Sequence, residues 1–374
     1  MKKIINCIAL LLFLPSLTAQ KNRAFEVKQV MERVADWQIA NHNDLQYRAQ
    51  NKRLNRGKHH PLDWTNGALY VGMTKWAAMA EDEKYFLWLK NIGETNDWKL
   101  HKRIYHADDH TVGQTYVHLY RKYKDEKMIQ PIINQLDYIL YHPSMSKMTW
   151  RSKFHQDRWN WCDALFMSPP VWVMISKITR DKKYLDFMVK EFKATTDFLF
   201  DKKESLYYRD ESYIGEKDNG TKIFWSRGNG WVLAGLVNVM IELDPNGTEY
   251  KYFLKIYNKM AQKLLKIQTP EGHWAMSLLG QKFYSTPETS GSSFFTFGLA
   301  WGINQGILDS EIYRPVVEKA WKALVGHVNE DGMLTYVQPI GAAPGEAYPD
   351  KTEVYGVGAF LSAGSEMYKL YGGK

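Results

Sequence analysis

The sequence predicts an all-α fold, an (α/α)6 barrel of six helical hairpins with only minor short strands in its loops. Apolar residues recur at helical spacing over long stretches, without the alternation that is typical of strands. A weak repeat also runs along the chain. In each unit a loop rich in Gly, Asp, Asn and Trp leads into an apolar stretch, a charged turn and an amphipathic stretch. Six such units, at a spacing of roughly 45 to 65 residues, can close into a ring.

The first twenty residues differ from the rest of the chain. Lys2 and Lys3 precede an apolar run over residues 4–14, and residues 17–20 provide a plausible cleavage region. The run is shorter than the about 20 residues that a membrane span requires. We therefore expect a signal peptide at residues 1–20, a secreted or periplasmic protein without a membrane span, and a single barrel domain at residues 21–374.

The repeat units follow one another in chain order. Residues 112–123 carry an apolar stripe, residues 124–127 a charged turn, and residues 129–140 the return helix. Residues 171–178 and 184–199 repeat this pattern. The six loops that open the units begin near Asp63, His106, Asn160, Trp225, Thr289 and Glu353.

Further signals concern turns and strands. Residues 244–247 and 306–309 are turn sequences at positions where a helix should stop. We expect short strands near residues 205–209 and 334–337. An open helical solenoid is the alternative architecture. Charged and aromatic residues gather at the same end of every unit, which a closed barrel with one mouth explains better.

Charge and cysteine content narrow the functional classes. The formal charge of +8 falls to +6 without Lys2 and Lys3, a mild excess that fits an anionic substrate. The chain has no lysine run and no nucleic-acid-binding module, so we expect no nucleic-acid partner. Cys7 lies in the leader, so Cys162 alone remains and no internal disulfide can form. We expect a monomer or a weak homo-oligomer.

The segment from Arg158 to Pro170 is the most informative. It places Asp163 among tryptophan, cysteine, leucine, phenylalanine and methionine side chains. Apolar surroundings penalise the charged carboxylate and raise its pKa, which makes it a proton donor near neutral pH. Pro169 and Pro170 suit the first turn of a helix, so Asp163 should lie on the loop that enters it. The alternative is an aspartate that caps a helix beside the core.

The mouth of the barrel should collect aromatic and charged side chains. Tryptophans beside carboxylates and an arginine suggest a sugar site, because aromatic faces cover the apolar side of a pyranose ring. Arg227, in a Gly-Asn-Gly segment, could bind a uronate through two hydrogen bonds. Trp64, Trp159 and Trp231 could instead be core anchors near helix starts. The candidate sugar-binding tryptophans are Trp64, Trp159, Trp161, Trp225 and Trp231.

The segment from His106 to His110 carries two adjacent carboxylates. Asp108 and Asp109 should point in different directions, which disfavours a metal site, since metal ligands more often share one face. One of them could cap a helix, and otherwise one is a charged partner for Asp163. Cys162 is expected to be a core residue, because its thiol would resist ionisation in apolar surroundings.

These motifs resemble glycoside hydrolase family 105, the unsaturated rhamnogalacturonyl and glucuronyl hydrolases, which are related to family 88. The resemblance rests on residues 161–170, on residues 225–231, and on the Asp108-Asp109 pair ahead of Gly113, and it spans roughly residues 25–370. It implies the same barrel, with Asp163 as general acid and base. It also implies a second acidic role for Asp109 or Asp108, of which Asp109 is favoured because it stands four residues before Gly113.

The resemblance further places Trp225 and Arg227 at the sugar, with Asp108, His106 and the other mouth tryptophans as substrate-binding candidates. One departure concerns position 152, a serine here, where many relatives have a histidine eleven residues before the catalytic aspartate. The nearest histidine is His155. The contacts around the adjoining sugar should therefore differ from those of such relatives.

The implied reaction is hydration of a vinyl ether. Polysaccharide lyases leave a 4,5-unsaturated uronic acid at the non-reducing end, and protonation at C4 followed by addition of water at C5 would release it. No metal or organic cofactor is needed. The hypothesis is an exported hydrolase for unsaturated acidic oligosaccharides derived from pectic rhamnogalacturonan, ulvan or arabinogalactan. The alternatives are a sugar epimerase or a polysaccharide lyase on the same barrel, or a non-catalytic glycan-binding protein.

Overall fold

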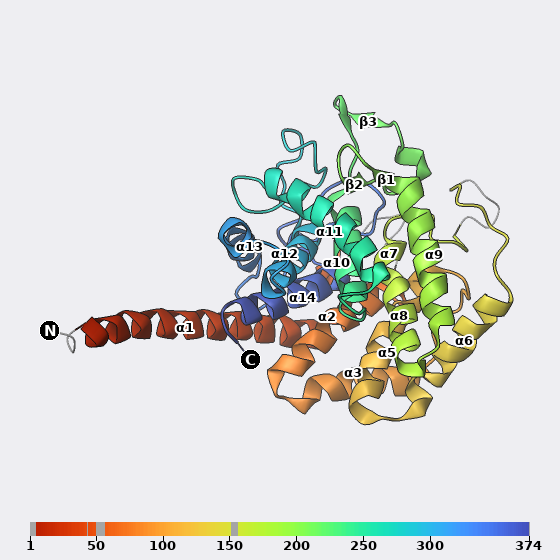
Figure 1. The fold of residues 1–374 in the computed structure, drawn as a ribbon, viewed down its shortest axis with the longest axis horizontal. Helices are drawn as coiled ribbons and strands as arrows, with labels where there is room; N and C mark the ends of the chain where they lie inside the picture. Colours follow the sequence, from red (N-terminus) through yellow and green to blue (C-terminus); the bar gives the residue numbers. More distant parts are fainter. Residues whose placement is uncertain (1–4, 43, 50–56, 151–155, 374) are drawn as a thin grey trace.

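The computed structural model describes residues 5–42, 44–49, 57–150 and 156–373, with side chains from residue 21 onward. Within this part of the chain, six helices form an inner ring (Figure 1). Each contacts the next in chain order, and the last contacts the first, so the ring is closed. The inner helices are α2 (Trp64–Ala80), α5 (Gly113–Tyr123), α8 (Pro169–Thr179), α10 (Ser226–Met240), α12 (Thr289–Asn304) and α14 (Val354–Leu370). The predicted (α/α)6 barrel is confirmed, and the open solenoid is wrong.

The outer helices lie against this ring. They are α1 (Ile5–Ala40), α3 (Glu83–Thr95), α6 (Gln130–Tyr141), α9 (Lys182–Leu199), α11 (Thr248–Lys266) and α13 (Ser310–Val325). Five of them follow their inner helix in the chain, whereas α14 ends near the C-terminus. The outer partner of α14 is α1, from the other end of the chain, which contacts both α14 and α2. The sequence analysis did not foresee this closure.

Helix α1 packs on the barrel only through its second half. Val27, Met31 and Val34 on that half are buried, whereas the beginning of α1 extends away from the body (Figure 1). Within the described residues, none of the helices combines the length and the apolar character that a membrane span requires. The expected signal peptide falls partly on residues 1–4, outside the described residues, and stays a prediction.

The two rings differ in the way that their sequences indicate. Most inner helices are covered on nearly all sides; in α12 every residue from Thr289 to Ile303 is buried, whereas α5 exposes part of its last turn. The outer α11 buries one stripe and exposes the rest.

Helices α2 and α14 approach most closely at two glycines. A Cβ added to Gly358 would lie 2.1 Å from the carbonyl oxygen of Ala68, a contact that only glycine can avoid.

The remaining elements are short. They are η1 (Leu45–Tyr47), α4 (Ala107–His110), η2 (Glu126–Met128), α7 (Ala164–Met167) and η3 (Glu211–Tyr213), with β1 (Phe200–Asp201) antiparallel to β2 (Leu206–Tyr207) and β3 (Lys217–Asp218) antiparallel to β4 (Thr221–Lys222). The strand expected at 205–209 is confirmed for Leu206–Tyr207, which form β2. The strand expected at 334–337 is wrong, because this segment forms a single bridge between Leu334 and Val328 and otherwise bonds irregularly.

The loops expected to open the units are largely helix starts. Helix α10 begins at Ser226, so the Gly-Asn-Gly segment lies in its first turns and not in a loop; α12 likewise begins at Thr289. The small residues serve close packing, since a Cβ on Gly230 would lie 3.2 Å from the Cα of Gly291. The motif residues at the mouth are therefore held by rigid helical backbone.

Candidate active site

Asp163 precedes α7 and is 9% exposed. Its side chain makes no hydrogen bond to the start of that helix, so it is not explained as a helix cap. Burial raises the pKa of Asp163, and the nearby Arg209 guanidinium partly opposes the rise. The thiol of Cys162 lies 3.4 Å from Oδ2 of Asp163, and burial raises the pKa of this thiol well above its usual range. Both sequence expectations, a protonatable aspartate and an inert cysteine, agree with this geometry.

Arg209 is the cation beside Asp163, and the sequence analysis missed it. Its Nε lies 3.7 Å from Oδ2 of Asp163. The backbone explains this proximity: Trp161 and Asp210 form an antiparallel bridge, and the N–H of Cys162 donates to the carbonyl of Arg209 at 2.8 Å. This pairing ties two segments that are far apart in the sequence, and nothing in the local sequence of Arg209 signals it.

Two further contacts hold the Arg209 guanidinium. It lies 4.5 Å from the ring centroid of Trp150, and its Nη1 donates to Asp210 at 2.6 Å. Its Nε is buried without a hydrogen-bond partner, and 14% of the side chain is exposed. Trp150 is another residue of the site that sequence reasoning did not identify.

Asp108 lies on α4, which contacts α7, and it is near enough to Asp163 for the charge of Asp163 to act on it. The carboxyl is 17% exposed. Burial raises the pKa of Asp108 to about 7; Arg103 counteracts the rise, and the charge of Asp163 adds to it. Two carboxyl groups with raised pKa values thus share one site, an arrangement suited to holding a single proton between them at neutral pH.

Asp109 points elsewhere, as expected from its adjacency to Asp108. It is 1% exposed and accepts hydrogen bonds from Arg103, at 2.5 Å from Nη2 and at 2.7 Å from the backbone N–H. Burial would raise the pKa of Asp109, but these bonds from Arg103 more than offset it and lower the pKa. The preference for Asp109 as second acid therefore has no geometric support; the structure favours Asp108. Spacing to a glycine could not distinguish two neighbouring carboxylates.

His106 stands just before α4 and supports Asp108. Its Nδ1 accepts from the Asp108 N–H at 3.3 Å, and its ring lies 5.0 Å from that of Trp161. Burial, aided by the charge of Arg103, lowers the pKa of His106 to about 4, so the imidazole is neutral at neutral pH. His106 therefore orients Asp108 and backs Trp161, and it adds no positive charge.

Most candidate tryptophans are buried in the structure, so their expected place at the sugar finds no support in its geometry. Trp161, Trp225 and Trp231 are at most 2% exposed, so their faces are covered by protein. Trp159 lines a separate cavity of about 580 Å³ together with Phe187, outside the inner ring. Composition cannot tell an aromatic residue that anchors a helix start from one that offers a free face.

Trp64 is the candidate tryptophan that keeps some exposure. It is partly buried, and its ring stacks on Tyr355 with centroids 5.1 Å apart. It stands at the start of α2, and Tyr355 lies in the first turn of α14, so this pair lies at the mouth. Trp64 thus fits the sugar-binding role that the sequence suggested.

Arg227 has a different environment from the one expected. It is 0% exposed and lies between the rings of Trp225 and Tyr355, at 4.5 and 4.9 Å from their centroids. Its Nη1 and Nη2 donate to the carbonyls of Gln338 and Pro339 at 2.6 and 2.9 Å. The two terminal nitrogens that were expected to bind a uronate thus bind backbone carbonyls, and Arg227 anchors the segment after Val337.

This geometry gives a prediction for Arg227→Lys. Lysine cannot reach both carbonyls with a planar fork, so we expect the free energy of unfolding to fall by about 2 kcal/mol, the value of two lost hydrogen bonds. Chemical denaturation measures it, and Arg180→Lys, at an exposed arginine, is the matched control. Unchanged stability together with a raised KM would instead restore Arg227 as a substrate ligand.

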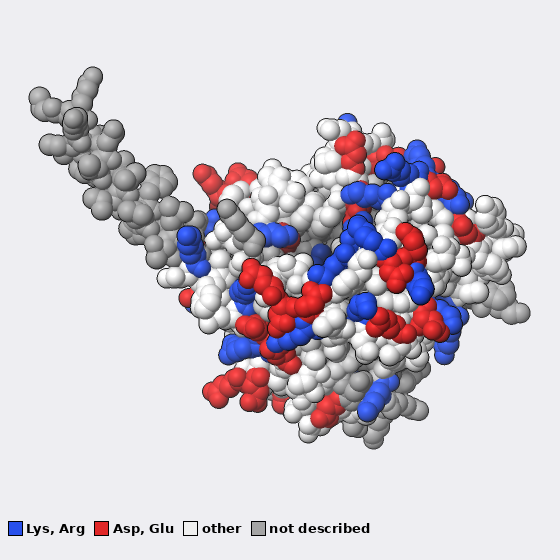
Figure 2. Space-filling view, turned by 90° about the horizontal axis from the view of Figure 1, so that it is seen from below, with Lys and Arg blue, Asp and Glu red and all other residues white. Residues whose placement is uncertain are grey.

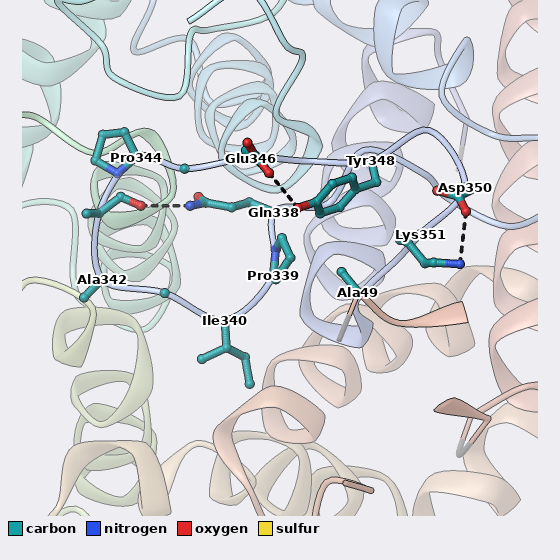
Figure 3. Close-up of a pocket in the computed structure, with 13 residues that line it drawn as sticks. Ala49, Gln338, Pro339, Ile340, Ala342, Pro344, Glu346, Tyr348, Asp350 and Lys351 are labelled. Atoms are coloured by element: carbon teal, nitrogen blue, oxygen red, sulfur yellow. Dashed lines mark hydrogen bonds and ion pairs between the residues drawn. The ribbon is translucent and has the colours of Figure 1, made fainter. Parts of the chain in front are cut away.

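A cavity of about 900 Å³ lies beside this anchor (Figure 3). The segment from Gln338 to Lys351 runs around it, and Ala49 closes one side. Gln338 links the cavity to the mouth, since its Oε1 accepts from Trp225 Nε1 at 2.7 Å and its Nε2 donates to the carbonyl of Ala343 at 2.8 Å. The cavity thus adjoins the aromatic cluster around Arg227.

Charge elsewhere gives little guidance. Figure 2 shows lysine and arginine intermixed with aspartate and glutamate over the face that it views, without a field of one sign. Among the residues that the structure describes, no cluster of three or more His, Cys, Asp or Glu side chains could hold a metal ion.

Comparisons with known proteins place these features in context. A family model described as Glycosyl Hydrolase Family 88 matches residues 16–371. The chain is 36% identical to an unsaturated 3S-rhamnoglycuronyl hydrolase of Alteromonas sp. (strain LOR), over 91% of this chain and 85% of that protein. It is 40% identical to a protein of the same name from Formosa agariphila, over 83% of this chain and 85% of that protein.

Solved structures agree in fold. A glycosyl hydrolase family 88 protein from Bacteroides vulgatus matches with a TM-score of 0.80 and 28% identity, over 92% of this chain and 99% of that one. A protein named as a polysaccharide lyase matches with a TM-score of 0.81 and 32% identity, over 93% and 98%. Both span nearly the whole barrel.

Proposed function

Because the chain belongs to glycosyl hydrolase family 88, whose model covers residues 16–371, we propose that it removes a 4,5-unsaturated uronic acid from the non-reducing end of lyase-generated oligosaccharides. The observation that carries the proposal is the buried carboxyl group of Asp163 together with the partly exposed carboxyl group of Asp108, both with raised pKa values at one mouth. Such a pair can deliver one proton at neutral pH without a metal.

The substrate is, in this proposal, a uronyl group linked to rhamnose, with a sulfated rhamnose of the ulvan type preferred over pectic or arabinogalactan products. Two relatives named as unsaturated 3S-rhamnoglycuronyl hydrolases, at 36% and 40% identity, support it. Export is part of the proposal and rests on the basic and apolar residues at the start of the chain.

The reaction proceeds by hydration of the C4=C5 vinyl ether. Protonated Asp163 donates its proton to C4, and positive charge develops at C5 and the ring oxygen. Asp108 orients a water molecule that adds at C5, and the Asp163 carboxylate takes up the proton that this water releases. The resulting hemiketal opens and expels the next sugar. The rule that relates carboxylate separation to stereochemistry does not apply, since water does not attack C1.

The rest of the oligosaccharide extends from the mouth past Trp64 and Tyr355 into the cavity bounded by residues 338–351. The exposed part of the Trp64 ring can cover one sugar face. The cavity, at about 900 Å³, has the size of known ligand sites, about 300 to 1,000 Å³. Backbone groups and Tyr348 would contact the sugars beyond the cleaved bond.

Ultraviolet absorbance tests the proposal. The conjugated enol ether of the unsaturated uronate absorbs, and the product does not. We expect absorbance to fall when the protein acts on lyase digests, and to fall fastest with sulfated rhamnose-linked products. Desulfated digests of the same polymer are the matched control. A polysaccharide lyase, the second candidate because one solved relative bears that name, would raise the absorbance of intact polymer instead.

Isotope labelling tests the mechanism. In D₂O we expect the product to carry deuterium at C4, because the proton of Asp163 exchanges with solvent before transfer. In ¹⁸O-water, prompt mass spectrometry should find the label on C5. Product without C4 deuterium, from substrate that was turned over, would exclude protonation at C4 and with it this mechanism.

A further inference from the structure

We propose that Arg209 binds the carboxylate of the unsaturated uronic acid, and that this binding releases Asp163 from the Arg209 cation so that it can hold a proton. The inference rests on the proposed function and concerns the same site. The sequence had assigned carboxylate recognition to Arg227. The structure assigns it to a residue from a different segment of the chain.

The position of Arg209 fits this ligand. In a 4,5-unsaturated uronate the carboxylate carbon is bonded to C5, the neighbour of C4. A cation that binds this carboxylate must therefore lie within a few ångströms of the acid that protonates C4. Arg209 satisfies this requirement, with its Nε 3.7 Å from Oδ2 of Asp163. Arg227 also has an Nε without a hydrogen-bond partner, but it is 0% exposed and both its terminal nitrogens donate to carbonyls, so a substrate carboxylate cannot reach it.

The guanidinium is also oriented and incompletely satisfied. Trp150 supports one face at 4.5 Å, and Asp210 fixes Nη1 at 2.6 Å. Asp210 is itself 1% exposed and anchored by the Ser212 N–H at 2.9 Å, so the arginine is held in place. The buried Nε has no hydrogen-bond partner, because Asp163 stands beyond hydrogen-bonding distance. Because 14% of the Arg209 side chain is exposed, a substrate carboxylate can approach the guanidinium and replace this loose ion pair.

The exchange changes the charge balance around Asp163. In the free protein the Arg209 cation favours the ionised form of Asp163 against burial. A bound carboxylate neutralises that cation and adds a negative charge, so protonation of Asp163 becomes more favourable when substrate is present. The acid is thus protonated in the complex, where the proton is needed. Charged and titratable groups that act on Asp163 are Arg209, Arg227, Asp108, Cys162 and Tyr213.

Matched substrates and variants test the carboxylate contact. We compare an unsaturated uronyl disaccharide with its neutral carboxyl methyl ester. Wild type should prefer the free acid by about 30-fold in kcat/KM, the effect of a charged hydrogen-bonded pair. Arg209→Gln should reduce kcat/KM for the acid by a similar factor and bring the preference close to unity, mainly through KM. Arg227→Lys, the comparison variant, should retain the preference.

The pH profiles test the coupling. The alkaline limb of kcat/KM reports the free enzyme and that of kcat reports the complex. In wild type the kcat limb should lie at higher pH, because substrate raises the pKa of Asp163. The two limbs should converge in Arg209→Gln, and Arg209→Lys, which keeps the charge but not the fork, should restore part of the separation.

A folded Arg209→Gln protein that still prefers the free acid as strongly as wild type would overturn the inference. So would coincident limbs in wild type. Thermal stabilisation of the protein by glucuronate gives a readout without turnover, and it should be lost in Arg209→Gln. Wild type that hydrolyses no unsaturated uronyl substrate, yet is stabilised by glucuronate through Arg209, would refute the proposed function and leave this contact standing.

Discussion

Replacing Asp163 with asparagine is expected to lower kcat on unsaturated uronyl oligosaccharides by at least about 100-fold, the lower end of the range for acid–base catalysis. Asparagine preserves the shape and the polar contacts of the side chain but cannot donate an acidic proton to C4. The barrel should remain folded, because burial already raises the pKa of Asp163 and a neutral group suits this environment. Absorbance kinetics measure the loss.

A matched substitution separates chemistry from general damage. Asp186→Asn makes the same change at an exposed position on α9 and should leave kcat unaltered. Circular dichroism and thermal unfolding should show the same fold for both variants. A folded Asp163→Asn protein with near-normal turnover would refute the role of Asp163, whatever the family.

The fold could be predicted because its signal is repeated. Most inner helices are apolar nearly all round and most outer helices carry one stripe, so a similar pattern recurs along the chain. Closure by α1 could not be predicted, since its partner α14 lies at the other end of the sequence and the apolar run at residues 4–14 obscures where α1 begins. The helix starts were taken for loops because glycine and serine there signal turns locally, whereas here they allow close packing.

Some residues of the candidate site could be identified from the sequence, and others could not. Asp163 was identifiable because its apolar neighbours in sequence are also its neighbours in space. Arg209 was not, because the bridge between Trp161 and Asp210 brings it to Asp163 from another segment. Trp150 was not, because it belongs to the site only through its ring contact with Arg209. The motif of Arg227 specifies an arginine at a helix start but not its partners, which are the carbonyls of Gln338 and Pro339, so the expected contact with a uronate finds no support in this geometry.

Asp108 and Asp109 present the remaining choice, and substitution separates them. Asp108→Asn should lower kcat by about 100-fold, because the group that orients water at C5 is lost. Stability should not suffer. The folded-state pKa of Asp108, about 7, lies above its ordinary value of 3.8, so the wild-type fold loses stability as pH rises through that interval. Asparagine lacks this charge, and the variant should therefore unfold at a higher temperature than wild type at pH values above about 7.

Asp109→Asn should behave in the opposite way. The pKa of Asp109 is lowered, so its charge stabilises the fold above its ordinary pKa and ceases to do so as pH falls. At neutral pH, asparagine leaves Arg103 without its charged partner and should cost about 1 to 3 kcal/mol of unfolding free energy. Thermal unfolding between pH 4 and pH 8, together with kcat for both variants, decides the assignment. A large loss of kcat in Asp109→Asn at full stability, with Asp108→Asn active, would return the second acidic role to Asp109.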